Sequence, residues 1–161
     1  MPADGMRTSV MPTDQRRESL AVAVIENSVR IERPPEDVFD YLVDLRNELE
    51  WNPDAQSMEK ITEGPIGVGA KFLAKWKQSR SVEVECAKFD RPHGWSYYNG
   101  GPLSVLFDAA VTPQGAGSLL AVRFEAHPNG LLKLIFPVLL RVLKRTEKRN
   151  MLCIKQTLEK E

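Results

Sequence analysis

The sequence predicts an α+β domain in which one long C-terminal helix lies across a curved antiparallel sheet of about seven strands. Three observations support this. Residues 130–161 carry apolar side chains at helical spacing, and residues 23–32 alternate apolar and polar side chains. Six more short segments alternate in the same way between turn residues. With two short helices expected after the first strand, all the helices should lie on one side of the sheet.

The first strand is predicted over residues 23–32, where a period of two indicates one buried and one exposed face. A pair of prolines ends it. Pro35 suits the first turn of a helix, because the N–H that proline lacks has no partner there. We therefore predict one short helix over residues 35–45 and a second over residues 46–51.

The middle of the chain is predicted to be an antiparallel meander. Its segments alternate aromatic or aliphatic residues with Lys and Glu, and Gly, Pro and Asn separate them. The six predicted strands comprise residues 58–62, 70–77, 82–86, 95–97, 103–111 and 120–126. Their apolar faces should point inward and their charged faces toward solvent.

The long C-terminal helix is amphipathic. Its apolar stripe comprises Leu132, Ile135, Phe136, Leu139, Val142 and Leu143. The stripe then takes in Thr146, Asn150 and Thr157. Burying an unpaired amide or hydroxyl costs roughly 1–3 kcal/mol, so these three either bond to protein groups or face a wet, roomy space. Pro137 predicts either a kink or a helix that restarts there.

Composition narrows the class of protein. At 161 residues with a formal net charge of zero, the chain fits one domain, and no global field draws it to nucleic acid or anionic lipid. Cys86 and Cys153 are expected to be reduced thiols of a cytoplasmic protein. No Cys/His cluster has metal-ligand spacing, so we expect neither a metal nor a cofactor.

The first twenty residues hold prolines and charges but no apolar run. Residues 1–20 are therefore expected to form a disordered tail, and not a secretory signal or membrane span. The folded domain is expected to comprise residues 21–161, with no integral membrane span.

Four stretches carry a resemblance to a known superfamily: residues 32–54 (ERPPEDVFDYLVDLRNELEWNPD), residues 67–72 (GVGAKF), residues 84–98 (VECAKFDRPHGWSYY) and the final helix with its early proline. With this order of elements, the chain resembles the START-like, or SRPBCC, superfamily. Its helix-grip fold is shared by polyketide cyclase/dehydrase-like and Bet v 1-like proteins. The resemblance covers residues 21–161 and rests on strand order and turns, so it bears on fold more than on chemistry.

The resemblance implies a cavity between the final helix and the concave face of the sheet. Members are often cytosolic binders or carriers of lipids, polyketides, quinones or hormones, and some are cyclases or dehydratases. The residues that we predict to contact such a ligand are Trp51, Phe72, Trp76, Val84, Cys86, Trp95, Tyr97, Phe107, Val122, Phe124, Leu139, Leu143, Thr146 and Asn150. The alternative for each aromatic residue is an ordinary packed core.

Candidates for catalysis are few. Glu48, Glu50 and Asp54 lie in the segment that caps one end of the cavity in the superfamily, and Glu50 or Asp54 could serve as general acid or base. The alternative is a solvated helical face. Tyr97 could donate a hydrogen bond to a ligand carbonyl.

Three functions follow from these patterns. The first is binding or transport of a hydrophobic small molecule, and the second is polyketide cyclase or dehydratase chemistry in the same cavity. The third is contact with a membrane surface or an acidic partner through the basic residues Arg141, Lys144, Arg145, Lys148 and Arg149, which could equally form a solvated face. Nucleic-acid binding is not expected, because no aromatic side chains are interleaved with those charges.

Overall fold

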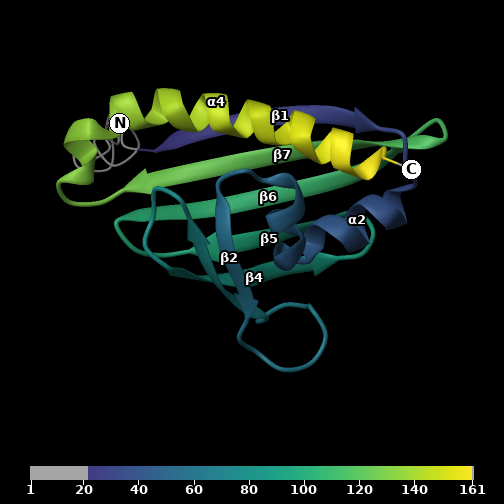
Figure 1. Ribbon diagram of the computed structural model, residues 1–161, viewed down its shortest axis with the longest axis horizontal. Helices are drawn as coiled ribbons and strands as arrows, with labels where there is room; N and C mark the ends of the chain where they lie inside the picture. Colours follow the sequence, from purple (N-terminus) through teal and green to yellow (C-terminus); the bar gives the residue numbers. More distant parts are fainter. Residues whose placement is uncertain (1–21, 161) are drawn as a thin grey trace, which may run out of the picture.

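The computed structural model describes residues 22–160, so the predicted tail of residues 1–20 lies outside the described residues. A seven-stranded sheet forms the body of the fold, in the order β1-β7-β6-β5-β4-β3-β2, with every neighbouring pair antiparallel. The strands are β1 (Ala23–Ile31), β2 (Ala55–Lys60), β3 (Lys71–Trp76), β4 (Val82–Asp90), β5 (Gly94–Asn99), β6 (Leu103–Gln114) and β7 (Gly117–Pro128). The predicted meander and the curved sheet are confirmed (Figure 1).

Most strands differ in length from the prediction, and in two of them an irregularity of the ladder is the physical reason. β4 was predicted to end at Cys86 but continues to Asp90, because a bulge between Cys86 and Lys88 interrupts the alternation without ending the ladder. β2 begins at Ala55, earlier than predicted, and it too contains an irregularity near its start. A bulge shifts which face a side chain occupies, so a pattern of period two fails beyond it.

The short helices follow β1. α2 (Pro35–Val43) has proline at its first position, as predicted, and it buries Val38 and Phe39 completely. It ends before the predicted residue 45, because Asp44 is extended and its side chain accepts a hydrogen bond from the backbone N–H of Arg46. A 3₁₀ turn, η1 (Leu45–Asn47), and α3 (Glu48–Trp51) complete the segment.

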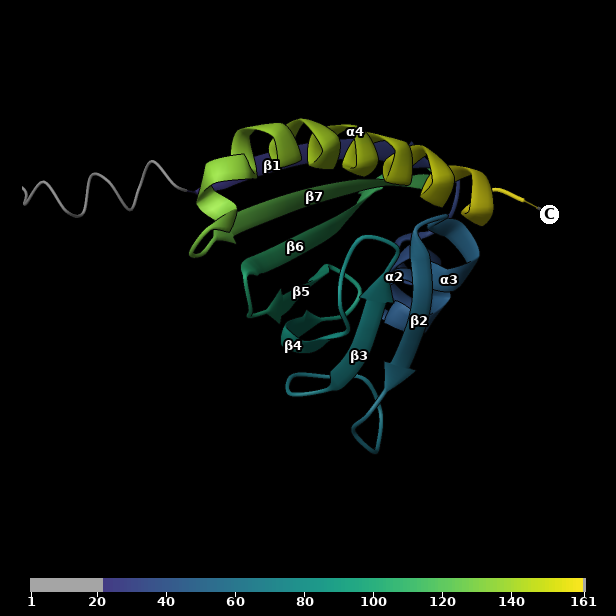
Figure 2. The same cartoon turned by 60° about the vertical axis from the view of Figure 1, so that its left-hand side comes forward.

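The last element, α4 (Leu132–Leu158), is one continuous helix with Pro137 inside it. The predicted alternative of a restart at Pro137 is therefore wrong. Proline removes a single ladder bond, and both Pro137 and Lys133, whose carbonyl loses its partner, are exposed to solvent. α4 packs chiefly against β1 and β7 at one edge of the sheet, with α2 and α3 beneath its C-terminal half (Figure 2).

The hydrophobic core fills only one end of the concave face. Phe39 of α2 packs edge-on against Phe89 and Trp95, with ring centroids 5.3 Å apart in both pairs. From α4, the core cluster takes Met151 and Ile154, both in the C-terminal half of the helix. The first half of α4 therefore spans the sheet without being packed into this core.

We predict that two glycines at close backbone contacts are needed for stability. A Cβ atom at Gly117 would lie 2.5 Å from the carbonyl oxygen of Ile31, and one at Gly94 would lie 2.5 Å from that of Ala109. Gly117→Ala and Gly94→Ala should each lower the free energy of unfolding by about 1–3 kcal/mol. Gly67→Ala is the control, because its Cβ would meet nothing within 4 Å. Urea denaturation measures all three, and equal losses would contradict the prediction.

Candidate functional site

A cavity of about 690 Å³ lies between α4 and the concave face of the sheet. Its walls come from the end of α2, from α3, from the β3–β4 and β5–β6 turns, from the strands β4 to β7 and from α4. The volume falls in the range of small-molecule sites, and most of the lining is apolar. The space exists because the core stops short of the first half of α4.

All of the predicted ligand-contacting residues line this cavity except Phe72 and Cys86. Those on the wall are Trp51, Trp76, Val84, Trp95, Tyr97, Phe107, Val122, Phe124, Leu139, Leu143, Thr146 and Asn150. Phe72 and Cys86 have no exposed surface and belong to the packed core. Phe72 meets the edge of Tyr97 with ring centroids 5.8 Å apart, so Tyr97 lies between it and the open space. Ligand contact by the lining residues stays a prediction.

The three catalytic candidates occupy different places. Glu50 is exposed and outside the cavity, where its carboxylate accepts a hydrogen bond of 2.6 Å from the hydroxyl of Tyr41. Asp54 reaches the cavity wall but is paired with Arg149, Oδ2 to Nη2, at 2.8 Å. Tyr97 donates its hydroxyl to the backbone carbonyl of Val43, so that hydroxyl is not free to polarise a ligand. Glu50, predicted as a possible general acid or base, therefore does not face the cavity.

The structure instead brings Glu48 into the cavity wall. Glu48 has an exposed fraction of 8%, and its Oε1 atom accepts hydrogen bonds of 2.6 Å from both Trp76 Nε1 and Asn52 Nδ2. Burial raises the pKa of the Glu48 carboxyl, and the two N–H donors oppose that rise. The sequence places Glu48 in the capping segment, but it does not identify Glu48 as the carboxylate that lines the cavity. Nothing in the sequence of a four-residue helix shows which of its carboxylates faces inward.

A second carboxyl, Glu147 of α4, lines the same part of the cavity. Burial, together with the charge of Glu48, raises the pKa of Glu147 to about 7 against the opposing charge of Arg149. Glu147 is not among the candidate residues predicted from the sequence. Its position four residues after Leu143 and three before Asn150 places it on the inward stripe, and that spacing could have found it.

Arg149 also departs from the predicted basic face. Its Nη2 atom lies 2.8 Å from Asp54 Oδ2 and 3.0 Å from Asn150 Oδ1, and its Nε atom is buried without a partner within residues 22–160. The other basic residues of that face, Arg141, Lys144, Arg145 and Lys148, are not part of the cavity lining. Contact of this face with a membrane or an acidic partner stays a prediction.

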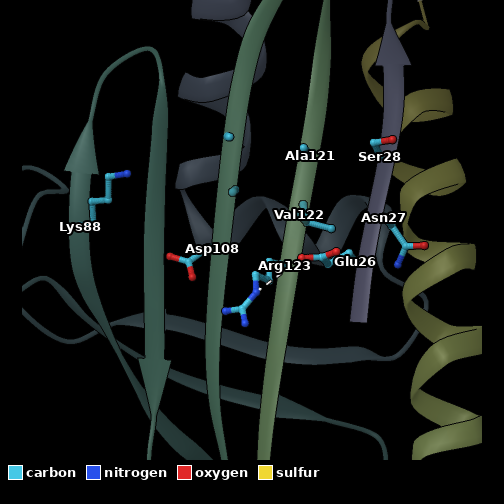
Figure 3. Close-up of a pocket in the computed structure, with 10 residues that line it drawn as sticks. Glu26, Asn27, Ser28, Lys88, Asp108, Ala121, Val122 and Arg123 are labelled. Atoms are coloured by element: carbon cyan, nitrogen blue, oxygen red, sulfur yellow. Dashed lines mark ion pairs between the residues drawn. The ribbon is translucent and has the colours of Figure 1, made fainter. Parts of the chain in front are cut away.

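A second, more open depression lies on the opposite face of the sheet (Figure 3). Its charged groups are largely paired. Arg123 lies 3.6 Å from Glu26, and Asp108 accepts a hydrogen bond from Ser96. With no enclosing helix and a more polar lining, this surface is a weaker candidate for a binding site than the cavity beneath α4.

Metal-binding and membrane-spanning features do not occur in the described part of the chain. Among residues 22–160, no group of three His, Cys, Asp or Glu side chains is arranged to hold a metal ion. None of the helices in that range is both long enough and apolar enough to cross a membrane. Cys86 and Cys153 are free thiols.

We predict that Glu147 makes stability depend on pH. The folded protein holds this carboxyl's proton up to about pH 7, whereas the unfolded chain releases it near the ordinary pKa of 4.5. The free energy of unfolding should therefore fall between about pH 4 and pH 8, by about 3 kcal/mol from this group. Glu147→Gln should remove most of that fall, and Lys148→Gln should not. Denaturation across this range tests it, and an unchanged slope in Glu147→Gln would refute it.

Known proteins share this geometry. The family model described as "Polyketide cyclase / dehydrase and lipid transport" matches residues 22–159. A search of curated protein sequences gave no match. Among solved structures, Ara h 8.0201 is 23% identical with a TM-score of 0.62, covering 85% of this chain and 97% of its own. TTHA0849 from Thermus thermophilus is 12% identical with a TM-score of 0.69, covering 84% and 97%.

One further structural neighbour is a two-domain protein. The di-domain ARO/CYC StfQ from the steffimycin biosynthetic pathway is 16% identical with a TM-score of 0.72, and the match covers 90% of this chain and 53% of StfQ. At these identities the neighbours establish the helix-grip fold. The family is established by the model that matches nearly the whole chain. The chain belongs to the polyketide cyclase/dehydrase and lipid transport family of the START-like, or SRPBCC, superfamily.

Proposed function

We propose that this protein binds a small hydrophobic molecule in the cavity beneath α4. The observation that carries the proposal is the unfilled space of about 690 Å³ with a mostly apolar lining. Each Å² of apolar surface that a ligand and this lining remove from water contributes about 25 cal/mol, so an apolar molecule would gain affinity over most of the wall.

The open side of the cavity supports the same proposal. Ile135 and Val142 line it from α4, yet their exposed fractions are 59% and 44%. Large aliphatic side chains on the lining of a hollow remain in contact with water until something covers them. A bound apolar ligand would cover both, and the free energy of burying them would add to its affinity.

We predict that a charge on the cavity side of α4 weakens binding and that the same charge on the outer side does not. Leu139→Asp should raise the Kd of N-phenyl-1-naphthylamine, a neutral apolar fluorophore, by at least roughly tenfold, because the ligand would have to desolvate a carboxylate. Val138→Asp is the matched control, since Val138 is 68% exposed and is not part of the lining. Equal effects of the two substitutions, or no binding by the unaltered protein, would refute the proposal.

A second candidate function is acid–base catalysis on a ligand in the same cavity. The observation that favours it is Glu147, a carboxyl on the cavity wall with a pKa of about 7, which is near the optimum for proton transfer at neutral pH. Two solved structures with this fold, BexL and StfQ, are di-domain ARO/CYC proteins, which supports cyclisation chemistry as a candidate for this fold. In that role Glu147 would take a proton from carbon next to a carbonyl.

The proton-abstracting capacity of Glu147 can be measured with 5-nitrobenzisoxazole. A base removes the ring C–H proton of this reagent while its N–O bond breaks, and a coloured cyanophenolate results. We expect a rate above background that rises with pH and has a midpoint at about pH 7. Glu147→Gln should abolish the excess, and Lys148→Gln, which alters a neighbour outside the cavity lining, should keep it. An excess rate that survives Glu147→Gln would exclude this carboxyl as the base.

A further inference from the structure

We propose that the inner end of the cavity selects apolar molecules whose polar end donates a hydrogen bond, as a hydroxyl or an ammonium group does, and rejects molecules that end in an anion. The inference rests on the proposed ligand binding and adds the chemical class of the ligand. It follows from which hydrogen-bonding atoms are free at Glu48, Glu147 and Asn150.

Acceptors are in excess at this end of the cavity. Glu48 uses only Oε1 for its two hydrogen bonds, and within residues 22–160 no donor is bonded to its Oε2. Glu147 has no hydrogen bond or ion pair to any described residue, although it lines the cavity. These carboxyl oxygens would be satisfied by a donor on the ligand.

Three N–H groups at the same end are already engaged, those of Trp76 Nε1, Asn52 Nδ2 and Arg149 Nη2. Trp76 Nε1 and Asn52 Nδ2 both bond to Glu48. Arg149 directs Nη2 to Asp54 and to the side-chain oxygen of Asn150. A ligand anion would therefore find few free N–H groups to accept from.

Asn150 adds a second and independent observation. It is 6% exposed and lines the cavity, and its Oδ1 atom is occupied by Arg149. Within the described residues its Nδ2 group has no acceptor. A hydroxyl oxygen on the ligand could accept from Asn150 while the hydroxyl hydrogen is donated to Glu48 or Glu147.

The charges around Glu147 also oppose an anion. Glu48 approaches from α3, and Asp54, from the loop after α3, neutralises Arg149, the nearest cation on α4. Lys77 lies 4.0 Å from Asp54, and Arg80 stands exposed in the β3–β4 turn. Glu48 and Glu147 thus have no ion-pair partner within residues 22–160, and an anion placed beside them would be repelled wherever they are ionised.

Titration of Glu147 gives this selectivity a pH dependence. Burial and the neighbouring Glu48 hold its pKa at about 7 against the opposing charge of Arg149. As pH rises from 6 to 8, the site becomes more negative. The affinity for an ammonium end should therefore increase, while the affinity for a hydroxyl end should change little.

Three molecules with the same ten-carbon chain test the proposal: decanol, decylamine and decanoate. Each displaces N-phenyl-1-naphthylamine from the full chain at pH 8, below its critical micelle concentration. We expect decanol and decylamine to displace the fluorophore with inhibition constants at least roughly tenfold lower than that of decanoate. Glu147→Gln should narrow the gap between decylamine and decanoate, and Lys148→Gln should leave it unchanged. Retained fluorophore binding by Glu147→Gln shows that this variant is folded.

The outcomes separate this inference from the proposed function. If decanoate competes as well as the other two, or better, the selectivity is refuted while ligand binding stands. If the fluorophore and all three molecules fail to bind, the proposed function itself is refuted. If the ratio of the inhibition constants of decanoate and decylamine is unchanged in Glu147→Gln, the role of this carboxyl is refuted. If that ratio increases from pH 6 to pH 8 only when Glu147 is present, the role is supported.

Discussion

The length of α4 exceeds the length of the packed core beneath it, and the rest of this structure depends on that difference. α4 has 27 residues and rises about 1.5 Å per residue, so it is about 40 Å long and runs the length of the sheet. The apolar groups of α2 and of the C-terminal half of α4 fill only one end of the concave face. A helix held at the β1–β7 edge therefore leaves a hollow under its first half, which a larger set of core side chains would otherwise occupy.

The buried carboxyl of Glu48 and the half-buried carboxyl of Glu147 oppose folding, and their presence needs a reason. A carboxylate removed from water is costly unless hydrogen bonds replace its hydration. Glu48 has two such bonds, from Trp76 and Asn52, so part of its cost is offset. Glu147 has no such partner among the described residues, and an apolar side chain there would be more stable at neutral pH. A position that lowers stability in this way would be explained by the proposed ligand binding and not by folding.

Sequence patterns predicted the antiparallel meander, and most of the residues predicted to contact a ligand do line the cavity, since side-chain alternation assigns each residue to a face. They did not predict whether an inward-facing side chain lines the cavity or lies in the packed core. Phe72 and Cys86 face inward as expected but lie in the filled half of the core. The bulge after Cys86 concealed the end of β4, and Glu147, which lines the cavity, was not selected. These errors share a cause, because periodicity along one element carries no information about what neighbouring elements place against it.

The two ends of the cavity differ enough to orient a ligand. Glu48, Asn150 and Glu147 concentrate the polar groups under the C-terminal half of α4, where α3 closes the space. Toward the start of α4, the lining is aliphatic and aromatic, and Ile135 and Val142 remain open to solvent. If an amphiphilic molecule were bound with its polar end outward, the carboxyls at the inner end would have no hydrogen-bond donor. Its apolar tail would then lie against these charged groups. In the opposite orientation, the polar end of the ligand would bond to the carboxyls and its apolar tail would cover the apolar lining. The difference between the two ends of the cavity would therefore determine how the proposed ligand is oriented.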